Sequence, residues 1–476
     1  MIVDWLSGMG SVCVVAAVLL SAGLILLIIH NGRLHRQLLM EQDRSRTMLH
    51  FDPLSGLPNR TYLLEELNLL SAESDESGAL FLINIDHFTH INDTFGPTSG
   101  DWILKEVGVR LQALVPPEAT VYRLGGDEFV VLMQEVMSER DTTQFAARLI
   151  KGFKSPFNMG NSNSLHISIS IGISLFPQHA SNVEDLLTSA DVALYQAKKG
   201  GKGFYTVYDT SMQLKLRERM EIEKHLLYAL DYDELELHYQ PQVDAVSEKI
   251  VGFEALLRWN SPKLGRVSPD KFIPIAEESR LIIPIGEWVL ITACEFLSRV
   301  HEQGFRDCKI SVNLSVMQLK QDNFLDTVSE LLEQSGIEPE YIEIEITESL
   351  LMESSEREHL VTKLNRLRTV GIGIALDDFG TGYSSLSYLQ VLPITILKMD
   401  KQFLAKTEED EASRSLASII LLIGHRLGLT IVAEGVETTG QLAFLREHEC
   451  DLIQGYLYSM PLPEQDALSL LASWRT

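Results

Sequence analysis

The 476-residue sequence contains only four cysteines, at positions 13, 294, 308 and 450. Their spacing offers no close pair and no zinc-binding pattern. A disulfide-stapled secreted fold and a zinc site are therefore not expected. We expect the cysteines to be small buried residues in a reducing compartment.

Positive charge is also scarce in this sequence. The chain has 40 Lys and Arg against 66 Asp and Glu, a formal net charge of −26 at pH 7. Proteins that bind duplex DNA draw affinity from cationic side chains, so DNA is not expected as a partner. An anionic substrate would need metal ions or a local basic pocket instead. The length predicts two or three domains, and no low-complexity tract or short-period repeat occurs.

Between Trp5 and Ile29 there is no charged residue at all. This stretch is long enough to cross a bilayer, and four arginines follow it within 20 residues. We predict a transmembrane helix over 5–29 and a linker helix over 30–50, with everything downstream in the cytoplasm. A cleaved signal peptide is the alternative. It fits poorly, because Asp4 stands where a basic cluster is expected and no small-residue cleavage site precedes polar sequence.

Residues 51–208 mix strand and helix patterns. Alternating apolar residues predict strands over 79–85, 129–133 and 166–175, and helical stretches cover 102–114 and 183–198. Together they predict an α+β layer fold. A polar, helix-prone stretch over 209–230 then separates this domain from a second one over 231–476.

A glycine pair followed by two acids lies between two apolar strands of the first domain, in the motif Arg123 to Phe129. With Asp52 to Arg60, Ile91-Asn92-Asp93, Gly100-Asp101 and Ala190 to Tyr195, it resembles the GGDEF domain of diguanylate cyclases. The resemblance implies a polymerase-palm-like fold whose glycines let the backbone approach a nucleotide and whose acids reach its magnesium ion. The GTP-binding residues that it implies are Asn92, Asp101, Asp127, Lys198 and Lys202.

This domain departs from the GGDEF pattern where metal and phosphate would bind. Asn84 stands at the position of the family's first metal carboxylate, Thr89 replaces a lysine and Pro97 a histidine. The arginine-rich segment at the end of the family pattern reads Lys198 to Phe204 here. We expect an inactive domain that binds GTP or acts in dimerisation and regulation. A residual cyclase and a relic that binds nothing are the alternatives.

After residue 250, seven short apolar runs each stop at a carboxylate, an amide or a lysine. They cover 252–254, 310–313, 342–345, 374–378, 396–398, 431–434 and 452–454. Short strand-like runs separated by longer helical stretches predict a parallel barrel, which keeps its chemistry at the C-terminal ends of its strands. A solvated strand end explains any one of these residues, but seven together indicate an enzyme.

The same residues begin seven motifs that resemble, in order, those of the EAL domain, the bacterial cyclic di-GMP phosphodiesterase. The motifs are Glu254 to Trp259, Asn313 to Ser315, Glu345 to Glu348, Asp377 to Ser384, Leu397 to Asp400, Glu434 to Glu437 and Gln454 to Tyr456. The resemblance covers about 260 residues. It implies a TIM-type (β/α)8 barrel that hydrolyses cyclic di-GMP to linear pGpG. Together with the apolar segment over 5–29, it leads us to expect a homodimer in the bacterial inner membrane.

The residue types suit two-metal chemistry. Two divalent cations can activate a water and neutralise charge on phosphate oxygens, and Mg²⁺ or Mn²⁺ prefers oxygen ligands. The resemblance implies that one ion is held by Glu254, Asn313, Glu345 and Asp377. The other would be held by Asp377, Asp378 and Glu434.

The resemblance also implies the remaining roles. Lys398 and Glu434 would be catalytic residues. Lys398 would orient or deprotonate the attacking water; the alternative is that this buried lysine only balances the charge of the acids around it. Glu348 would pin the loop that organises the second metal and the dimer contact. Arg258 would bind a substrate phosphate, and Gln454 would orient the water or the lysine.

Two further interpretations stay open. A non-catalytic cyclic di-GMP receptor typically loses metal-binding acids, and none is lost here. A bifunctional cyclase and phosphodiesterase depends on whether Asn84 permits cyclase activity.

Overall fold

The computed structural model describes residues 49–72, 77–134, 138–158, 164–180, 182–347, 357–380, 391–405 and 410–474, with positions 27, 30, 31, 33, 389 and 407 in addition. The chain divides into two compact units, Met1–Arg217 and Glu218–Thr476. The division falls within helix α7 (Thr210–Leu226), which overlaps the predicted linker helix.

Across the described ranges, no helix is long and apolar enough to span a membrane. The transmembrane helix predicted over 5–29 lies outside the described residues except for Leu27, and so does most of the linker helix predicted over 30–50.

The first unit is built on a five-stranded sheet in the order β2-β3-β1-β6-β7. Its strands are β1 (Gly78–Ile85), β2 (Ala119–Gly125), β3 (Glu128–Gln134), β6 (Ile169–Phe176) and β7 (Tyr205–Val207), beside a short hairpin of β4 (Phe157–Asn158) and β5 (Ser164–Leu165). Its helices are α2 (Arg60–Ala72), α3 (Phe88–Phe95), α4 (Pro97–Leu114), α5 (Glu139–Phe153) and α6 (Val183–Lys199). All neighbouring strands are antiparallel except β6 and β7.

Helices cover both faces of this sheet. Successive side chains of a strand point to opposite faces, so Phe81 and Ile83 of β1 pack in the apolar cluster that includes α4 and α5. Leu80 and Leu82 pack in the cluster that includes α2 and α6. The predicted α+β layers are confirmed, with two boundaries shifted by more than one residue. Helix α4 starts five residues earlier than predicted, because Pro97 is at its first position, where a missing N–H costs nothing.

The other shifted boundary is the start of β6. The strand begins at Ile169, three residues later than predicted. Ser168 does not extend the strand, since its carbonyl accepts a hydrogen bond from the Asp86 N–H and its hydroxyl donates to the Asp86 carboxylate.

Within the described part of the second unit, eight strands close into a barrel. They are β8 (Leu235–Asp244), β9 (Ile250–Ser261), β11 (Lys309–Asn313), β12 (Ile342–Thr347), β13 (Gly373–Phe379), β14 (Ile396–Met399), β15 (Thr430–Ala433) and β16 (Leu452–Ile453). Strands β10 (Gly265–Val267) and β17 (Leu462–Pro463) pair outside this ring, with β9 and β8.

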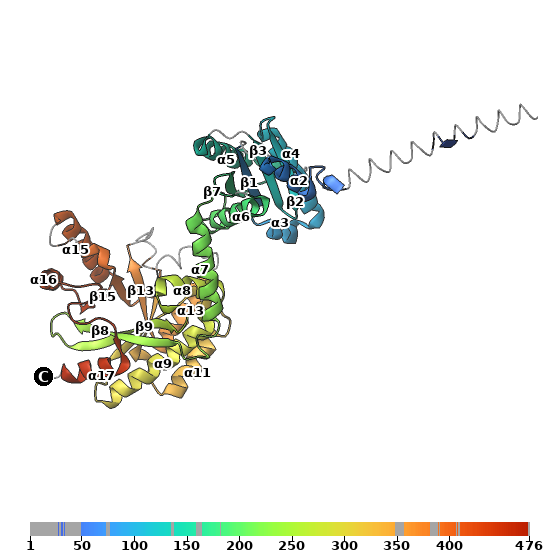
Figure 1. Cartoon of the computed structure of the whole chain (residues 1–476). Helices are drawn as coiled ribbons and strands as arrows, with labels where there is room; N and C mark the ends of the chain where they lie inside the picture. Colours follow the sequence, from blue (N-terminus) through green and yellow to red (C-terminus); the bar gives the residue numbers. More distant parts are fainter. Residues whose placement is uncertain are drawn as a thin grey trace, which may run out of the picture. The chain divides into compact units, whose positions relative to one another are not determined.

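Helices surround this barrel (Figure 1). They are α8 (Pro269–Glu278), α9 (Ile282–Glu302), α10 (Val316–Leu319), α11 (Phe324–Ser335), α13 (Arg357–Val370), α15 (Glu411–Arg426), α16 (Thr439–Glu447) and α17 (Glu464–Ser473), with the 3₁₀ turns η1 (Pro339–Tyr341) and η2 (Lys401–Phe403). Their apolar faces and those of the strands form one continuous core, so the barrel strands are held on both sides.

The barrel differs from the predicted all-parallel arrangement in two respects. Strand β8 runs antiparallel to both neighbours, β9 and β16, because only a short turn joins β8 to β9 and so short a connection requires antiparallel strands. Glu254 was expected at a strand end but lies in the middle of β9, which continues to Ser261. The long hairpin of β8 and β9 therefore carries its polar residues further along the strand than the other strands do.

Candidate active site

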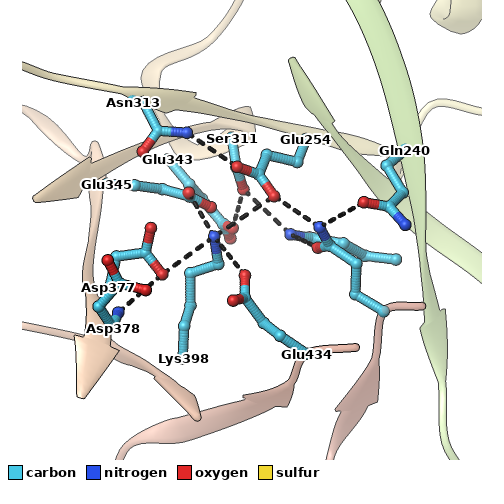
Figure 2. Close-up of polar contacts among 12 residues, drawn as sticks. Gln240, Glu254, Ser311, Asn313, Glu343, Glu345, Asp377, Asp378, Lys398 and Glu434 are labelled. Carbon is cyan, nitrogen blue, oxygen red and sulfur yellow. Dashed lines mark hydrogen bonds and ion pairs between the residues drawn. The ribbon is translucent and has the colours of Figure 1, made fainter. Parts of the chain in front are cut away.

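The predicted polar residues of the barrel meet at one end of it. Asn313 is the last residue of β11, whereas Glu434 and Gln454 directly follow β15 and β16. Glu345 and Lys398 are two residues and one residue from the ends of β12 and β14. Because parallel strands end at the same rim, residues distant in sequence lie around one point (Figure 2).

Lys398 lies at the centre of this group. Its Nζ atom is 2.7 Å from Glu434 Oε1 and 3.4 Å from both Glu254 Oε2 and Asp377 Oδ1. It also forms a very short ion pair with Glu345. The lysine side chain is only 1% exposed, and an unpaired ammonium so deep in a protein would be very costly. In this structure the four carboxylates and the lysine compensate one another.

The charges in the group shift one another's proton affinities. Burial opposes the charge on Lys398, but the carboxylates of Glu254 and Glu345 outweigh it and raise the lysine pKa well above its usual value. Burial, opposed by Lys398, raises the pKa of Glu434 to about 7. Burial and the neighbouring Glu254 carboxylate raise the pKa of Glu345.

Two adjacent aspartates point to the same place because β13 is irregular there. Neighbouring residues of a regular strand face opposite sides. Asp378, however, has a φ of 54°, and the pairing of β13 with β14 shifts register between Leu376 and Phe379. Asp377, Asp378 and Glu434 thus each offer a carboxylate oxygen within 4.8 Å of one another. A strained residue in a bulge is a common way to aim side chains at a site.

Two amides hold the carboxylate of Glu254. Asn313 Nδ2 donates to Glu254 Oε1 at 2.8 Å, and Gln454 Nε2 donates to Glu254 Oε2 at 2.5 Å. Despite burial, the charge of Lys398 and the bond from Gln454 lower the pKa of Glu254. Gln454 was expected to orient the lysine or a water; in this structure it orients a carboxylate.

A cavity of about 700 Å³ opens beside these residues. Glu254, Asn313, Asp377 and Glu434 contribute to its wall, and so does Arg258, four residues further along β9 and on the same face of the strand. The Arg258 guanidinium donates to the carbonyl of Leu257 at 2.9 Å. Glu348, the remaining predicted catalytic residue, lies outside the described residues.

The donor set fits divalent cations of the Mg²⁺ or Mn²⁺ type. All its ligand atoms are carboxylate or amide oxygens, which such hard cations prefer. Glu345 Oε1 is buried and has no hydrogen-bond partner within the described ranges. A buried carboxylate oxygen without a donor needs a positive partner. The structure thus brings together the side chains of both predicted ligand sets.

The first unit gathers its predicted GTP-binding residues less completely. Asn84 ends up buried in β1, directly opposite Glu128 of β3. Burial, Asp127 and Asp191 raise the pKa of Glu128, and Lys198 opposes them, so these charges lie around one end of the sheet.

The other predicted GTP-binding residues lie close to this end of the sheet. Asn92 is on α3, which begins three residues after β1, and its Oδ1 is buried without a hydrogen-bond partner in the described residues. Asp101 is exposed in the first turns of α4, and Lys202 Nζ lies 3.4 Å from the ring of His87. Strand β1 contains no Asp or Glu, and Asn84 is the residue at the position where the GGDEF pattern predicts a metal carboxylate.

Several buried polar residues of the barrel were not predicted, and four of them lie close to the predicted ligands. They are Gln240 and Gln242 on β8, Ser311 on β11 and Glu343 on β12. Ser311 and Glu343 each precede a predicted ligand by two residues, so the period of a strand could have placed them on the same inner face. Strand β8 was missed because its polar residues interrupt any apolar run.

Comparison with protein-family models agrees with this geometry. Residues 223–461 match the EAL domain model, and residues 49–203 match the model described as diguanylate cyclase, GGDEF domain. The chain belongs to the EAL domain family. It is a GGDEF–EAL tandem protein, as the motifs of both halves predicted.

The matches to curated relatives extend over both domains of this chain. The bifunctional diguanylate cyclase/cyclic di-GMP phosphodiesterase MucR of Pseudomonas aeruginosa is 38% identical over 424 residues, which are 88% of this chain and 61% of MucR. The cyclic di-GMP phosphodiesterase PdeR of Escherichia coli is 33% identical over 424 residues, 89% of this chain and 63% of PdeR. The chain therefore spans less than two thirds of these relatives.

Solved structures resemble the chain as well. The PaMucR phosphodiesterase in complex with c-di-GMP is 40% identical, covers 52% of this chain and 99% of its own, and has a TM-score of 0.50. The EAL enzyme Bd1971 in its cAMP- and cyclic-di-GMP-bound form is 28% identical, covers 73% and 82%, and has a TM-score of 0.52.

Proposed function

We propose that this protein hydrolyses cyclic di-GMP to linear pGpG in its barrel domain. The observation that carries the proposal is the meeting of Glu254, Glu345, Asp377 and Glu434, from four different strands, around Lys398 at a 700 Å³ cavity. The names of MucR and PdeR and the ligand of the PaMucR structure support cyclic di-GMP as the substrate.

In this proposal, the carboxylates and Asn313 hold two ions, Mg²⁺ or Mn²⁺. When bound, such ions lower the pKa of a water and neutralise charge on the phosphate oxygens. Lys398 keeps its ammonium charge and donates a hydrogen bond to the attacking water, which it orients. Arg258 offers two parallel donors to a phosphate that enters the cavity, a geometry suited to guanidinium. Gln454 and Asn313 keep both oxygens of Glu254 directed by hydrogen bonds.

For the first domain we propose a regulatory role without cyclase activity. The amide of Asn84 brings no negative charge to the position of the family's metal carboxylate, and a magnesium ion held with a triphosphate needs such a ligand. Asn92 and Asp101, to which the GGDEF pattern assigns contacts with guanine, are both present and favour retained binding of GTP. Dimerisation through either domain, and anchoring in the bacterial inner membrane by residues 5–29 with both domains cytoplasmic, complete the proposal.

The test is to incubate the purified protein with cyclic di-GMP and Mg²⁺, with and without GTP, and to separate the nucleotides. We expect pGpG to form, its rate to change with GTP, and no cyclic di-GMP to form from GTP alone. Tight binding of cyclic di-GMP without turnover would instead favour the receptor interpretation. Cyclic di-GMP made from GTP would favour the bifunctional one.

A further inference from the structure

Beneath the candidate metal ligands lies a second layer of buried polar side chains. Gln242 is 2% exposed, Ser311 1% and Glu343 4%. In the register of β8 and β9, Gln240 is opposite Glu254 and Gln242 is opposite Gly252, one step further into the barrel. This layer does not contain a predicted ligand, so the proposed chemistry leaves it unexplained.

Hydrogen bonds connect this layer to Glu254 by way of Gln454, and the donor and acceptor of each bond are defined. Gln242 Nε2 donates to Ser311 Oγ at 3.5 Å and to Gln454 Oε1 at 3.1 Å. The Ser311 hydroxyl donates in turn to Glu343 Oε2 at 3.0 Å, and Lys309 Nζ is 2.9 Å from Glu343 Oε1. Gln242 therefore uses its amide hydrogens on both sides, toward Glu343 and toward Gln454.

The bond from Gln242 decides which way the amide of Gln454 faces. Because Gln454 Oε1 accepts from Gln242, its Nε2 is turned to the other side, where it donates to Glu254 Oε2 and to Gln240 Oε1 at 3.2 Å. The reversed amide would place its oxygen against the Glu254 carboxylate. It would also direct two N–H donors at the Gln242 donor, so both contacts would become repulsive.

Two glycines leave the space that this layer needs. A Cβ atom on Gly252 would lie 3.3 Å from Gln242 Oε1 and 3.1 Å from the carbonyl oxygen of Lys309. A Cβ atom on Gly373 would lie 2.9 Å from Glu343 Cγ. The two strands that carry Glu254 and Asp377 are thus free of side chains at the positions where Gln242 and Glu343 pack.

From this arrangement we infer that Gln242 is a positioning residue for the metal site. It fixes the Gln454 amide, which in turn holds the Glu254 carboxylate in the orientation that binds a cation. The inference rests on the proposed function, since it assumes that Glu254 is a ligand. Partners of this kind, one step removed from the metal, typically change its affinity 10- to 100-fold when they are removed.

The first test measures Mn²⁺ binding to the purified 476-residue chain by calorimetry, without nucleotide. Gln242→Met keeps the volume and removes the amide, so we expect the Kd for Mn²⁺ to rise about 10-fold. Gln441→Met is the control: Gln441 is also buried, but its amide bonds the backbone of Glu437, Thr438 and Leu404 instead of side chains of the candidate site. This control should lower stability and leave the Kd unchanged. Equal Kd values for wild type and Gln242→Met would overturn the inference.

A double-mutant cycle separates positioning from simple packing. If Gln242 acts through Gln454, Gln242→Met should weaken Mn²⁺ binding in the wild type but have almost no effect in a Gln454→Met background. An equal effect in both backgrounds would mean that Gln242 acts independently, and the inference would be wrong. Gln242→Leu, which also removes the amide and adds no charge, carries the same expectations if the methionine variant folds poorly.

Failure of the inference can be told apart from failure of the proposed function. A wild-type protein that binds no Mn²⁺ and does not hydrolyse cyclic di-GMP contradicts the two-metal proposal itself. A wild-type protein that does both, with Gln242→Met unchanged in Kd, contradicts only the role of Gln242. With the inference correct, kcat of Gln242→Met at saturating Mn²⁺ should approach that of the wild type, while the Mn²⁺ concentration for half-maximal rate rises about 10-fold.

Discussion

The barrel and the first domain both carry acidic groups at the ends of their strands, but the charges are balanced differently. In the barrel, four carboxylates surround one buried lysine, and a bulged strand adds a fifth acid, Asp378. In the first domain, the strand that should contribute a carboxylate contributes Asn84, buried opposite Glu128. An amide has nearly the shape of a carboxylate, so the sheet, which is held by apolar side chains on both faces, forms either way. The fold therefore does not by itself determine the chemistry at the end of a strand, which depends on the residue at that position.

The sharpest test of this contrast removes one acid from the barrel. Glu254→Gln keeps the shape of the side chain but removes its charge, and we expect hydrolysis of cyclic di-GMP to fall by more than about 100-fold. The control is Glu330→Gln, which changes an exposed carboxylate on helix α11 and should retain full activity. Near wild-type turnover by Glu254→Gln in Mg²⁺ would show that this group of acids is not the active site.

The second test removes the lysine that balances the acids. Lys398→Met leaves buried carboxylates without their partner, and breaking such a pair typically costs about 3 to 5 kcal/mol of unfolding free energy. We expect this loss in EDTA and a partial recovery in Mn²⁺, because a ligand that binds only the folded state stabilises it. Denaturant unfolding in both conditions measures the two values.

Lys271→Met provides the comparison for this experiment. Lys271 pairs with Glu218 at 2.6 Å, but both side chains are about half exposed. Exposed pairs contribute at most about 1 kcal/mol, so this variant should change little in either condition. A similar loss from both variants would mean that Lys398 does not have the special role assigned to it.

A third test adds the missing acid to the first domain. Asn84→Asp should increase the affinity for GTP with Mg²⁺ about 10-fold, which corresponds to about 1.4 kcal/mol. Titration calorimetry measures it, with the exposed Asn158→Asp as a control for added charge. If the wild type already converts GTP to cyclic di-GMP at a rate comparable to its hydrolysis activity, the contrast between the two sites is false.

The smallest expected effect is a pH dependence of metal binding in the barrel. Glu434 has a pKa of about 7, so below pH 7 it holds a proton that a metal ion must displace. Calorimetry in two buffers should detect more protons released on Mn²⁺ binding at pH 6 than at pH 8. Equal proton release at both values would contradict the assignment of Glu434 as a ligand.

The raised pKa of Glu434 also predicts how the stability of the metal-free protein depends on pH. The pKa of Glu434 is raised from 4.5, so its contribution to folding is complete below about pH 4.5. This contribution to the free energy of unfolding is lost as the pH rises through about 7, because Glu434 then loses its proton in the folded state as well.

The sequence by itself determined which residue types occur at the ends of the barrel strands, and their order along the chain. Asn313, Lys398, Glu434 and Gln454 could be placed because each ends a short apolar run, a local pattern that burial imposes on a strand. The layered α+β arrangement of the first domain was likewise predictable, whereas the consequence of Asn84 for cyclase activity stays a prediction.

Only the tertiary structure decided the direction of β8, the position of Glu254 inside β9 and the partner of Gln454. Strand β8 has no apolar run, and its direction depends on pairing with β9 and with β16, which is more than 200 residues away. The aim of Asp378 depends on a left-handed backbone within one bulge. The bond between Gln242 and Gln454 joins residues from the two ends of the domain. Contacts of this kind arise when the barrel closes, because closure brings together strands that carry no local record of their neighbours.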